Sequence, residues 1–347
     1  MKDQFGRAID YMRVSVTDRC NLRCVYCMPE EGVSAISHQD ILTFDEIARL
    51  CRIGAGLGIT KIKLTGGEPL VRKNLSVLLG MVKSIPGIEQ VTLTTNGILL
   101  KEQINELVYN GLDSVNVSID TLDPERYRKV TRGGCVEKAL KGLAAAAAFP
   151  DVRVKVNCVP LKDAQEEEYI QLALLAKDGR ADVRFIEMMP IGMGKIFSGR
   201  SSEEICSILK RTFGEPEQYR GRLGNGPAVY MQFPGFRKKV GFISAVSHQF
   251  CGGCNRVRLT SEGYMKPCLQ YGNGVDLRAL LRSGAGDDEI CETMRDIVFE
   301  KPACHQFSAD AGRKANAGAT LDAAEKTNAD AVGGMSLESK GMSKIGG

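Results

Sequence analysis

Hydrophobic and polar residues follow two alternating patterns through the first two thirds of the chain. Short runs rich in Val, Ile, Leu and Thr alternate with longer stretches that have one apolar and one polar face. The short runs predict buried strands, and the longer stretches predict amphipathic helices. The predicted strands are Met12–Thr17, Lys61–Thr65, Val91–Thr95, Ser114–Ile119, Val152–Val159 and Val183–Glu187. The predicted helices are Phe44–Leu57, Leu75–Ile85, Lys101–Asn110, Val136–Phe149 and Glu166–Ala176.

The spacing of these elements indicates the fold class. After a longer first step, strand starts recur roughly every thirty residues, which is typical of βα units that build a parallel sheet. Six units are visible, without an obvious seventh or eighth. The pattern therefore predicts an α/β fold, an incomplete (β/α)6 barrel similar to a TIM barrel. A doubly wound sheet fits the same pattern and stays open as an alternative.

The pattern changes after residue 213. Two predicted hairpins and two helices follow, and together they predict a smaller C-terminal α+β extension over residues 214–307. From Ser308 onward there are no aromatic residues and few large aliphatic ones, which predicts a flexible tail over residues 308–347. The predicted strands of the extension are Ala228–Phe233, Val240–Ser244, Arg256–Thr260 and Tyr264–Pro267, and its helices are Leu277–Arg282 and Asp287–Val298.

Composition excludes several classes of protein. Of the 347 residues, 43% are hydrophobic and 25% charged, as in a globular protein, and the net charge of +4 is too small to indicate nucleic-acid binding. It is compatible with a local basic pocket for an anionic small molecule. No apolar run reaches the roughly 18 residues of a membrane-spanning helix. The N-terminal segment lacks the apolar core of a signal peptide, so we expect a cytoplasmic protein.

Six of the twelve cysteines form two triplets, and the other six stand alone and are expected to be ordinary thiols. The first triplet, Cys20-x3-Cys24-x2-Cys27, follows the first predicted strand, and parallel α/β folds place their chemistry at that edge. Zinc sites and ordinary ferredoxin clusters take four ligands. Three cysteines on a four-iron cluster leave one iron free to bind a substrate. A zinc knuckle with a distant fourth ligand is the alternative.

The second triplet lies in the predicted C-terminal extension. It has the spacing Cys251-x2-Cys254-x13-Cys268, and His248 stands three residues upstream. The triplet again offers three thiolates without a fourth. A zinc site made by the three cysteines and His248 therefore remains an alternative to a second iron–sulfur cluster.

The first triplet resembles the signature of the radical S-adenosylmethionine superfamily, C-x3-C-x-aromatic-C, with Tyr26 as the aromatic residue. The segment Thr65-Gly66-Gly67-Glu68-Pro69, one βα unit later, resembles the motif that meets the amino group of S-adenosylmethionine in that superfamily. The resemblance implies that the methionine part of the cofactor chelates the open iron. One electron from the cluster then releases methionine and a 5′-deoxyadenosyl radical, while the protein orients the cofactor and excludes water.

The two triplets together resemble the GTP 3′,8-cyclase family of molybdenum cofactor biosynthesis. The match runs from Arg13 to Cys268 and resumes in the final segment from Met342 to Gly347. It implies two 4Fe-4S clusters, the second of which binds the purine of GTP. The adenosyl radical abstracts the ribose 3′-hydrogen, and C3′ closes onto C8 to give 3′,8-cyclo-7,8-dihydro-GTP. A radical peptide-modifying enzyme with an auxiliary cluster, and a zinc-stabilised binding module, are the alternatives.

The same resemblance implies partners and site residues. The partners are cyclic pyranopterin monophosphate synthase downstream, a low-potential electron donor such as flavodoxin or ferredoxin, and a second copy of the chain in a homodimer. The residues implied to contact S-adenosylmethionine are Tyr26, Gly67, Ser118 and Met189. Those implied to contact GTP are Arg13, Lys63, Thr94, Lys155, Arg256, Val257 and Arg258. Arg256, Arg258 and the terminal Gly346 and Gly347 are implied to act in catalysis.

The residues themselves support a basic pocket. Arg13, Lys63 and Lys155 lie inside predicted parallel strands, which are buried on both faces, so a solvated surface role is unfavourable for them. Arg256 and Arg258 are two positions apart in a strand and therefore share a face. Lys63 stands where the family usually has arginine, so it keeps the charge but loses the bidentate geometry.

Overall fold

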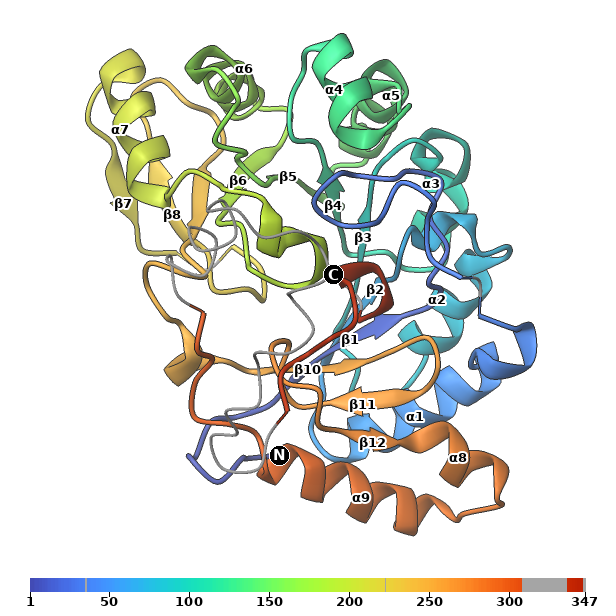
Figure 1. Ribbon diagram of the computed structural model, residues 1–347. Coiled ribbons are helices and arrows are strands. Elements are labelled where there is room, and N and C mark those ends of the chain that lie inside the picture. The colour runs from blue at the N-terminus through green and yellow to red at the C-terminus, as the bar shows by residue number, and fades with distance from the viewer. Residues whose placement is uncertain (35, 222, 308–335, 346–347) are drawn as a thin grey trace.

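The computed structural model describes residues 1–34, 36–221, 223–307 and 336–345, and this part of the chain forms one twelve-stranded sheet (Figure 1). The strand order is β12-β11-β10-β1-β2-β3-β4-β5-β6-β9-β8-β7. Each neighbouring pair from β10 through β1 and β6 to β9 is parallel. Because β1 to β6 follow one another in chain order, the sheet is the predicted incomplete barrel and not a doubly wound sheet.

The βα units lie close to their predicted positions, with small shifts at the ends. Helices cover the outer face of the sheet (Figure 1). The six strands are β1 (Tyr11–Ser15), β2 (Lys61–Thr65), β3 (Gln90–Thr95), β4 (Ser114–Ser118), β5 (Arg153–Cys158) and β6 (Asp182–Ile186). The five predicted helices are α1 (Phe44–Gly56), α2 (Leu75–Lys83), α3 (Leu100–Tyr109), α5 (Val136–Ala147) and α6 (Glu166–Lys177).

Two further helices were not predicted. Helix α4 (Pro124–Thr131) is mostly polar and therefore has a weak apolar stripe, but Asp123 caps it and proline occupies its first position. Helix α7 (Ser202–Phe213) begins with a capping box formed by Ser201 and Glu204. Both starts carry capping signals that are visible in the sequence.

The C-terminal strands continue the barrel sheet at both edges. Strand β9 pairs in parallel with β6 and forms the predicted hairpin with β8. Strand β10 pairs in parallel with β1 and forms the second hairpin with β11. The division of the chain at residues 213 and 307 stays a prediction. The bounds are β7 (Glu217–Tyr219), β8 (Val229–Gln232), β9 (Val240–Ile243), β10 (Arg256–Leu259), β11 (Tyr264–Lys266), β12 (Val275–Asp276), α8 (Leu277–Arg282) and α9 (Asp287–Phe299).

Side chains alternate between an apolar outer face and a polar inner face of the barrel. On β1, Met12 and Val14 are almost fully buried in the hydrophobic core. Arg13, between them, pairs in register with Lys63 on β2 and Arg258 on β10. Residues paired in register point to the same face, so these three basic side chains share the inner face.

The C-terminal segment 336–345 returns to the body of the protein. Leu337 forms a bridge with Tyr271, and the buried Glu338 pairs with Lys266. Ile345 is fully buried in a small apolar cluster. This segment, dark red in Figure 1, lies across the open side of the barrel. Among the described residues, no helix is both long and apolar enough to cross a membrane.

Candidate active site

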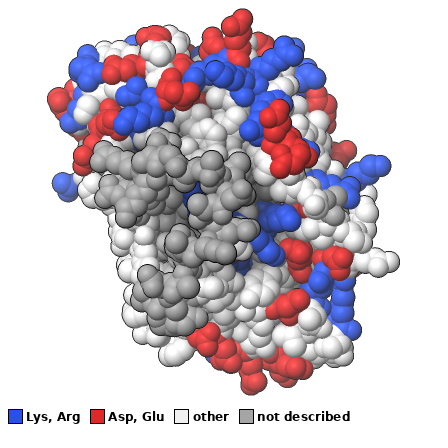
Figure 2. Space-filling view, in the orientation of Figure 1, with Lys and Arg blue, Asp and Glu red and all other residues white. Residues whose placement is uncertain are grey.

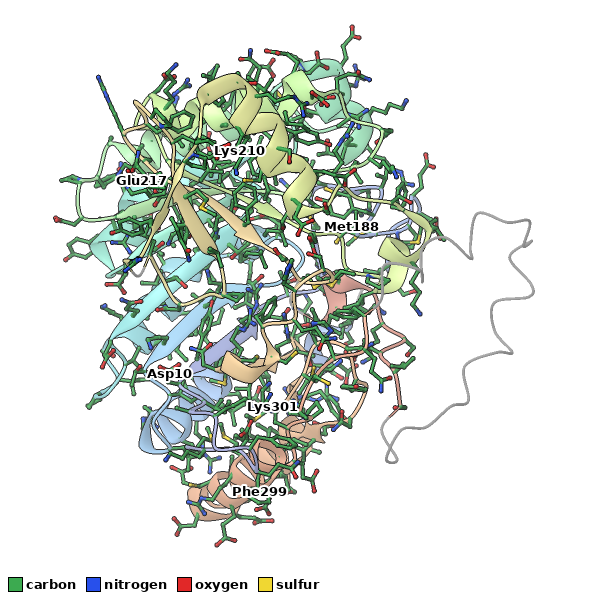
Figure 3. All side chains as sticks on the ribbon, turned by 90° about the vertical axis from the view of Figure 1, so that its left-hand side faces the viewer. Asp10, Met188, Lys210, Glu217, Phe299 and Lys301 are labelled. Atoms are coloured by element: carbon green, nitrogen blue, oxygen red, sulfur yellow. The ribbon has the colours of Figure 1, made fainter. Side chains whose placement is uncertain are left out.

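A cavity of about 340 Å³ lies at the carboxyl-terminal ends of the parallel strands. Its wall includes residues from the loop after β1, from the ends of β2 to β6 and from the C-terminal extension. Met188 and Lys301 both line it, and Figure 3, which labels them, shows Met188 above Lys301. All six cysteines of the two triplets line this one cavity: Cys20, Cys24, Cys27, Cys251, Cys254 and Cys268.

The first triplet lies in the loop between β1 and α1. The turn closes where the Cys27 N–H donates to the Cys24 carbonyl (2.9 Å), and the Leu22 N–H donates to the Cys20 Sγ (3.4 Å). Arg23 donates to the Cys20 carbonyl at 2.7 Å, and Arg132 donates to the Met28 carbonyl at 2.9 Å. Burial raises the pKa of Cys20 to about 11 and that of Cys24 well above its usual value.

The glycine-rich motif after β2 packs directly against this loop. A Cβ at Gly67 would collide with the Arg19 carbonyl, so only glycine allows the two backbones to approach this closely. Glu68 is buried and accepts hydrogen bonds from Thr95 Oγ1 (2.6 Å) and the Asn96 N–H (2.6 Å). Burial raises the pKa of the Glu68 carboxyl to about 7. Glu68 thereby ties the end of β2 to the end of β3.

A second carboxylate fixes the aromatic residue of the signature. Tyr26 donates from its hydroxyl to Asp120 Oδ2 at 2.6 Å, and Asp120 Oδ1 accepts from the Val159 N–H at 2.9 Å. Burial raises the pKa of Asp120 to about 6. Tyr26, Asp120, Ser118 and Met189 all line the cavity, so the loop of the first triplet is anchored to the ends of β4 and β5.

The second triplet is held between the N-terminus and the segment after α9. Arg7, buried and paired with Asp3, donates to the Cys251 carbonyl (2.8 Å) and the Ala303 carbonyl (2.8 Å). Arg256 Nη2 lies 3.7 Å from the Cys254 Sγ. Burial opposes ionisation of Cys254, but the positive charges of Arg256 and Lys301 outweigh it and lower the pKa of this thiol to about 7.

The inner face of the barrel carries the basic residues. Arg13, Arg256, Arg258 and Thr94 line the cavity, and Figure 2 shows Lys and Arg atoms in the hollowed middle of the face. Lys63 is buried, and the pKa of its ammonium is well below its usual value because of burial and the nearby charges of Arg13, Arg184 and Lys155.

Three predicted contacts of GTP lie behind the cavity wall. Burial lowers the pKa of Lys155 to about 7, with help from Arg184 and Arg153. Lys63 and Lys155 are both buried but are not part of the wall itself. Val257 points to the other face of β10 and packs in the hydrophobic core. Gly346 and Gly347 lie outside the described residues, so their predicted role stays a prediction.

Several residues of the wall and of the inner face of the barrel were not predicted. Arg184 donates from Nε to Asn157 Oδ1 at 2.8 Å on the inner face, and it could have been found as a cation inside an apolar strand. Lys301 donates to the Arg256 carbonyl at 2.9 Å, and His305 lies beside the second triplet. Lys301 and His305 lie in a segment whose hydrophobic residues follow no helix or strand period, so no sequence pattern selects them. His248 is exposed and is not part of the wall.

Comparison with known proteins identifies the family. Residues 14–176 match the Radical SAM superfamily, and residues 181–307 match the Molybdenum Cofactor Synthesis C family. A GTP 3′,8-cyclase of Clostridium perfringens (strain 13 / Type A) is 45% identical over 307 residues, which cover 88% of this chain and 95% of that protein. The chain belongs to the GTP 3′,8-cyclase family. A member from Alkaliphilus oremlandii (strain OhILAs) is 41% identical over 325 residues, or 92% of this chain and 98% of that protein.

Solved structures agree on the fold of this GTP 3′,8-cyclase family member. Streptococcus suis SuiB bound to S-adenosylmethionine superposes with a TM-score of 0.56 at 15% identity, covering 83% of this chain and 68% of SuiB. That identity supports the partial barrel alone. Membership in the radical SAM superfamily implies a 4Fe-4S cluster that binds S-adenosylmethionine. Among the described residues, no three His, Cys, Asp or Glu side chains converge on a position that could hold a single metal ion. The three cysteines of a 4Fe-4S cluster each bind a different iron, so they do not need to converge in that way.

Proposed function

We propose that this chain acts as a GTP 3′,8-cyclase in molybdenum cofactor biosynthesis. The observation that carries the proposal is the convergence of both cysteine triplets on one cavity, together with Arg13, Arg256 and Arg258. One triplet suits the cluster that binds S-adenosylmethionine. The other leaves a second open iron for a substrate, and the arginines suit the phosphates of a nucleotide.

The residues of the first triplet fit a cluster with an open iron. None of its three cysteines forms a disulfide, all three line the cavity, and a backbone N–H donates to one of the sulfurs. We assign Cys20, Cys24 and Cys27 to this cluster. The bound cluster and S-adenosylmethionine supply the radical that abstracts hydrogen from the substrate. The protein contributes the cavity wall, where Tyr26, Gly67, Ser118 and Met189 are assigned to hold the cofactor.

The second triplet also fits an iron–sulfur cluster. The sulfurs of Cys251 and Cys254 accept from the His305 N–H (3.4 Å) and from Arg256 Nη2 (3.7 Å). Cations near Cys254 favour the thiolate, which is the form that binds metals. We therefore assign Cys251, Cys254 and Cys268 to a second 4Fe-4S cluster whose open iron binds the purine of GTP.

The basic inner face fits the triphosphate. Burial and the nearby charges of Arg13, Arg184 and Lys155 together disfavour the charged form of Lys63 and lower its pKa. An anion in the barrel relieves that repulsion, because each cation gains an opposite charge in a partly desolvated site. Arg256 and Arg258 on β10 continue this group of basic side chains toward the second triplet. GTP then lies with its phosphates in the barrel and its base at the second triplet.

Lys63 provides a test of this assignment. Lys63→Met removes the charge and keeps most of the side chain, so it should weaken GTP binding by about tenfold or more, since a hydrogen bond to a charged group contributes about 1.5–3 kcal/mol. Lys63→Arg should bind GTP nearly as well as the wild type. Lys101→Met, an exposed change on α3, is the matched control. Equal affinity of the Lys63→Met and control variants for GTP in a titration contradicts the assignment.

The metal content distinguishes iron–sulfur clusters from zinc. After anaerobic reconstitution we expect about eight iron atoms per chain, four for each triplet, with matching sulfide and a brown absorbance. The activity test is incubation of this protein with GTP, S-adenosylmethionine and a reductant. Chromatography should separate a cyclised isomer of GTP that forms together with 5′-deoxyadenosine. Stoichiometric zinc without iron, or no new nucleotide, contradicts the proposal.

The remaining partners follow from the same proposal. The first cluster needs a low-potential one-electron donor, for which flavodoxin or ferredoxin is suited. The unstable product needs a downstream enzyme, cyclic pyranopterin monophosphate synthase. The same family assignment implies that two copies of the chain form a homodimer. None of the twelve cysteines forms a disulfide, which supports a reducing, cytoplasmic location.

A further inference from the structure

His305 is a buried polar residue in the cavity wall beside the second triplet. Its backbone N–H lies 3.4 Å from the Cys251 Sγ, and the residue is 6% exposed. The imidazole packs between two aromatic rings, with centroids 4.5 Å from Phe307 and 6.3 Å from Phe250. Gln249 donates to its carbonyl at 3.1 Å. The ring is therefore held in one orientation by packing and by backbone contacts.

The hydrogen bonds of the ring determine where its proton lies. The Phe307 N–H donates to His305 Nδ1 at 3.3 Å, so this nitrogen is the acceptor and the proton of the neutral ring is on Nε2. His305 Nε2 has no hydrogen-bond partner within the described residues. A buried donor without a partner is unfavourable, and such a donor in a cavity wall indicates a ligand that accepts from it.

The surroundings of His305 indicate which part of a ligand it meets. Arg13 and Arg258 lie on the barrel strands, and the guanidinium of Arg256 lies over the Phe250 ring. His305 itself offers an N–H donor against the rings of Phe250 and Phe307. A planar base with ring and exocyclic acceptors matches this environment. We propose that His305 Nε2 donates a hydrogen bond to an acceptor atom of the guanine base and so positions it at the second triplet. This inference rests on the proposed function.

Two ligands separate a contact to the base from a contact to phosphate. GTP contains both parts, whereas inorganic tripolyphosphate contains only the second. With the anaerobically reconstituted protein, His305→Leu should weaken GTP binding by about tenfold and leave tripolyphosphate binding unchanged. His305→Gln keeps an N–H donor of similar reach and should recover most of the affinity for GTP. His38→Leu removes an exposed histidine and should have no effect on either ligand.

Iron content is measured on every variant, and His305→Phe serves as a second variant without a donor that keeps the aromatic packing. The proposal is overturned if His305→Leu and His305→Phe bind GTP as tightly as the wild type. It is also overturned if both variants bind GTP and tripolyphosphate more weakly by the same factor. Loss of the iron of the second triplet in both variants overturns it too, because His305 then supports the cluster. A wild-type protein that does not bind GTP contradicts the proposed function itself.

Discussion

Cys254→Ala is expected to abolish GTP cyclisation while uncoupled cleavage of S-adenosylmethionine continues. Cys254 belongs to the second triplet, and its sulfur contacts Arg256 on β10. Without this ligand the protein should lose the second cluster, and the guanine base should then no longer be held in position. The first triplet lies in another loop, held by Arg23 and Arg132, which the substitution does not touch. Chromatography of the nucleotide product and of 5′-deoxyadenosine measures both reactions in one sample.

Cys304→Ala is the matched control for this variant. Cys304 is an exposed thiol in the same region, and its carbonyl accepts a hydrogen bond from the Tyr271 hydroxyl at 3.2 Å. We expect the control to cyclise GTP normally and to keep its iron. If Cys254→Ala cyclises GTP at the rate of the control, the assignment of a second cluster to this triplet is wrong.

Cys24→Ala is expected to abolish both reactions. Cys24 is half-buried and is the middle residue of the first triplet, joined to Cys27 by a turn, and the cluster needs all three sulfurs. Without this cluster there is no electron source for the cleavage of S-adenosylmethionine, so 5′-deoxyadenosine should fall to background. About half of the iron should be lost, since the second triplet remains.

Cys206→Ala serves as the control for this second substitution. Cys206 is a half-buried thiol on α7, outside the cavity wall. We expect it to keep full activity and full iron content. Continued formation of 5′-deoxyadenosine by Cys24→Ala contradicts the assignment of the first cluster to this loop.

Much of the fold could be predicted from local patterns. The predicted strand Lys61–Thr65 has the same bounds in the structure, because its apolar Ile62 and Leu64 pack in the core while Lys63 between them points to the inner face of the barrel. Helix α4 (Pro124–Thr131) was missed because few of its side chains are buried. The pairing of β9 with β6 and of β10 with β1 joins segments far apart in the chain, which local periodicity does not encode.

The site shows the same division between local and long-range information. Each cysteine triplet is a local signal, and the structure brings the two together in one cavity. Arg184 satisfies the same criterion as Lys63, a cation inside an apolar strand, and was overlooked. His305 and Lys301 carry no signal in their own segment. Their position becomes apparent only when Arg7 joins the segment after α9 to the loop of Cys251.

The central claim is that both triplets act on one GTP molecule in one cavity. GTP deuterated at C3′ tests it most directly, because the position of the label reports which hydrogen the radical removes. With the reconstituted protein, S-adenosylmethionine and a reductant, we expect the 5′-deoxyadenosine to carry deuterium and the cyclised nucleotide to have lost it. Unlabelled 5′-deoxyadenosine, formed without a cyclised nucleotide, contradicts the account.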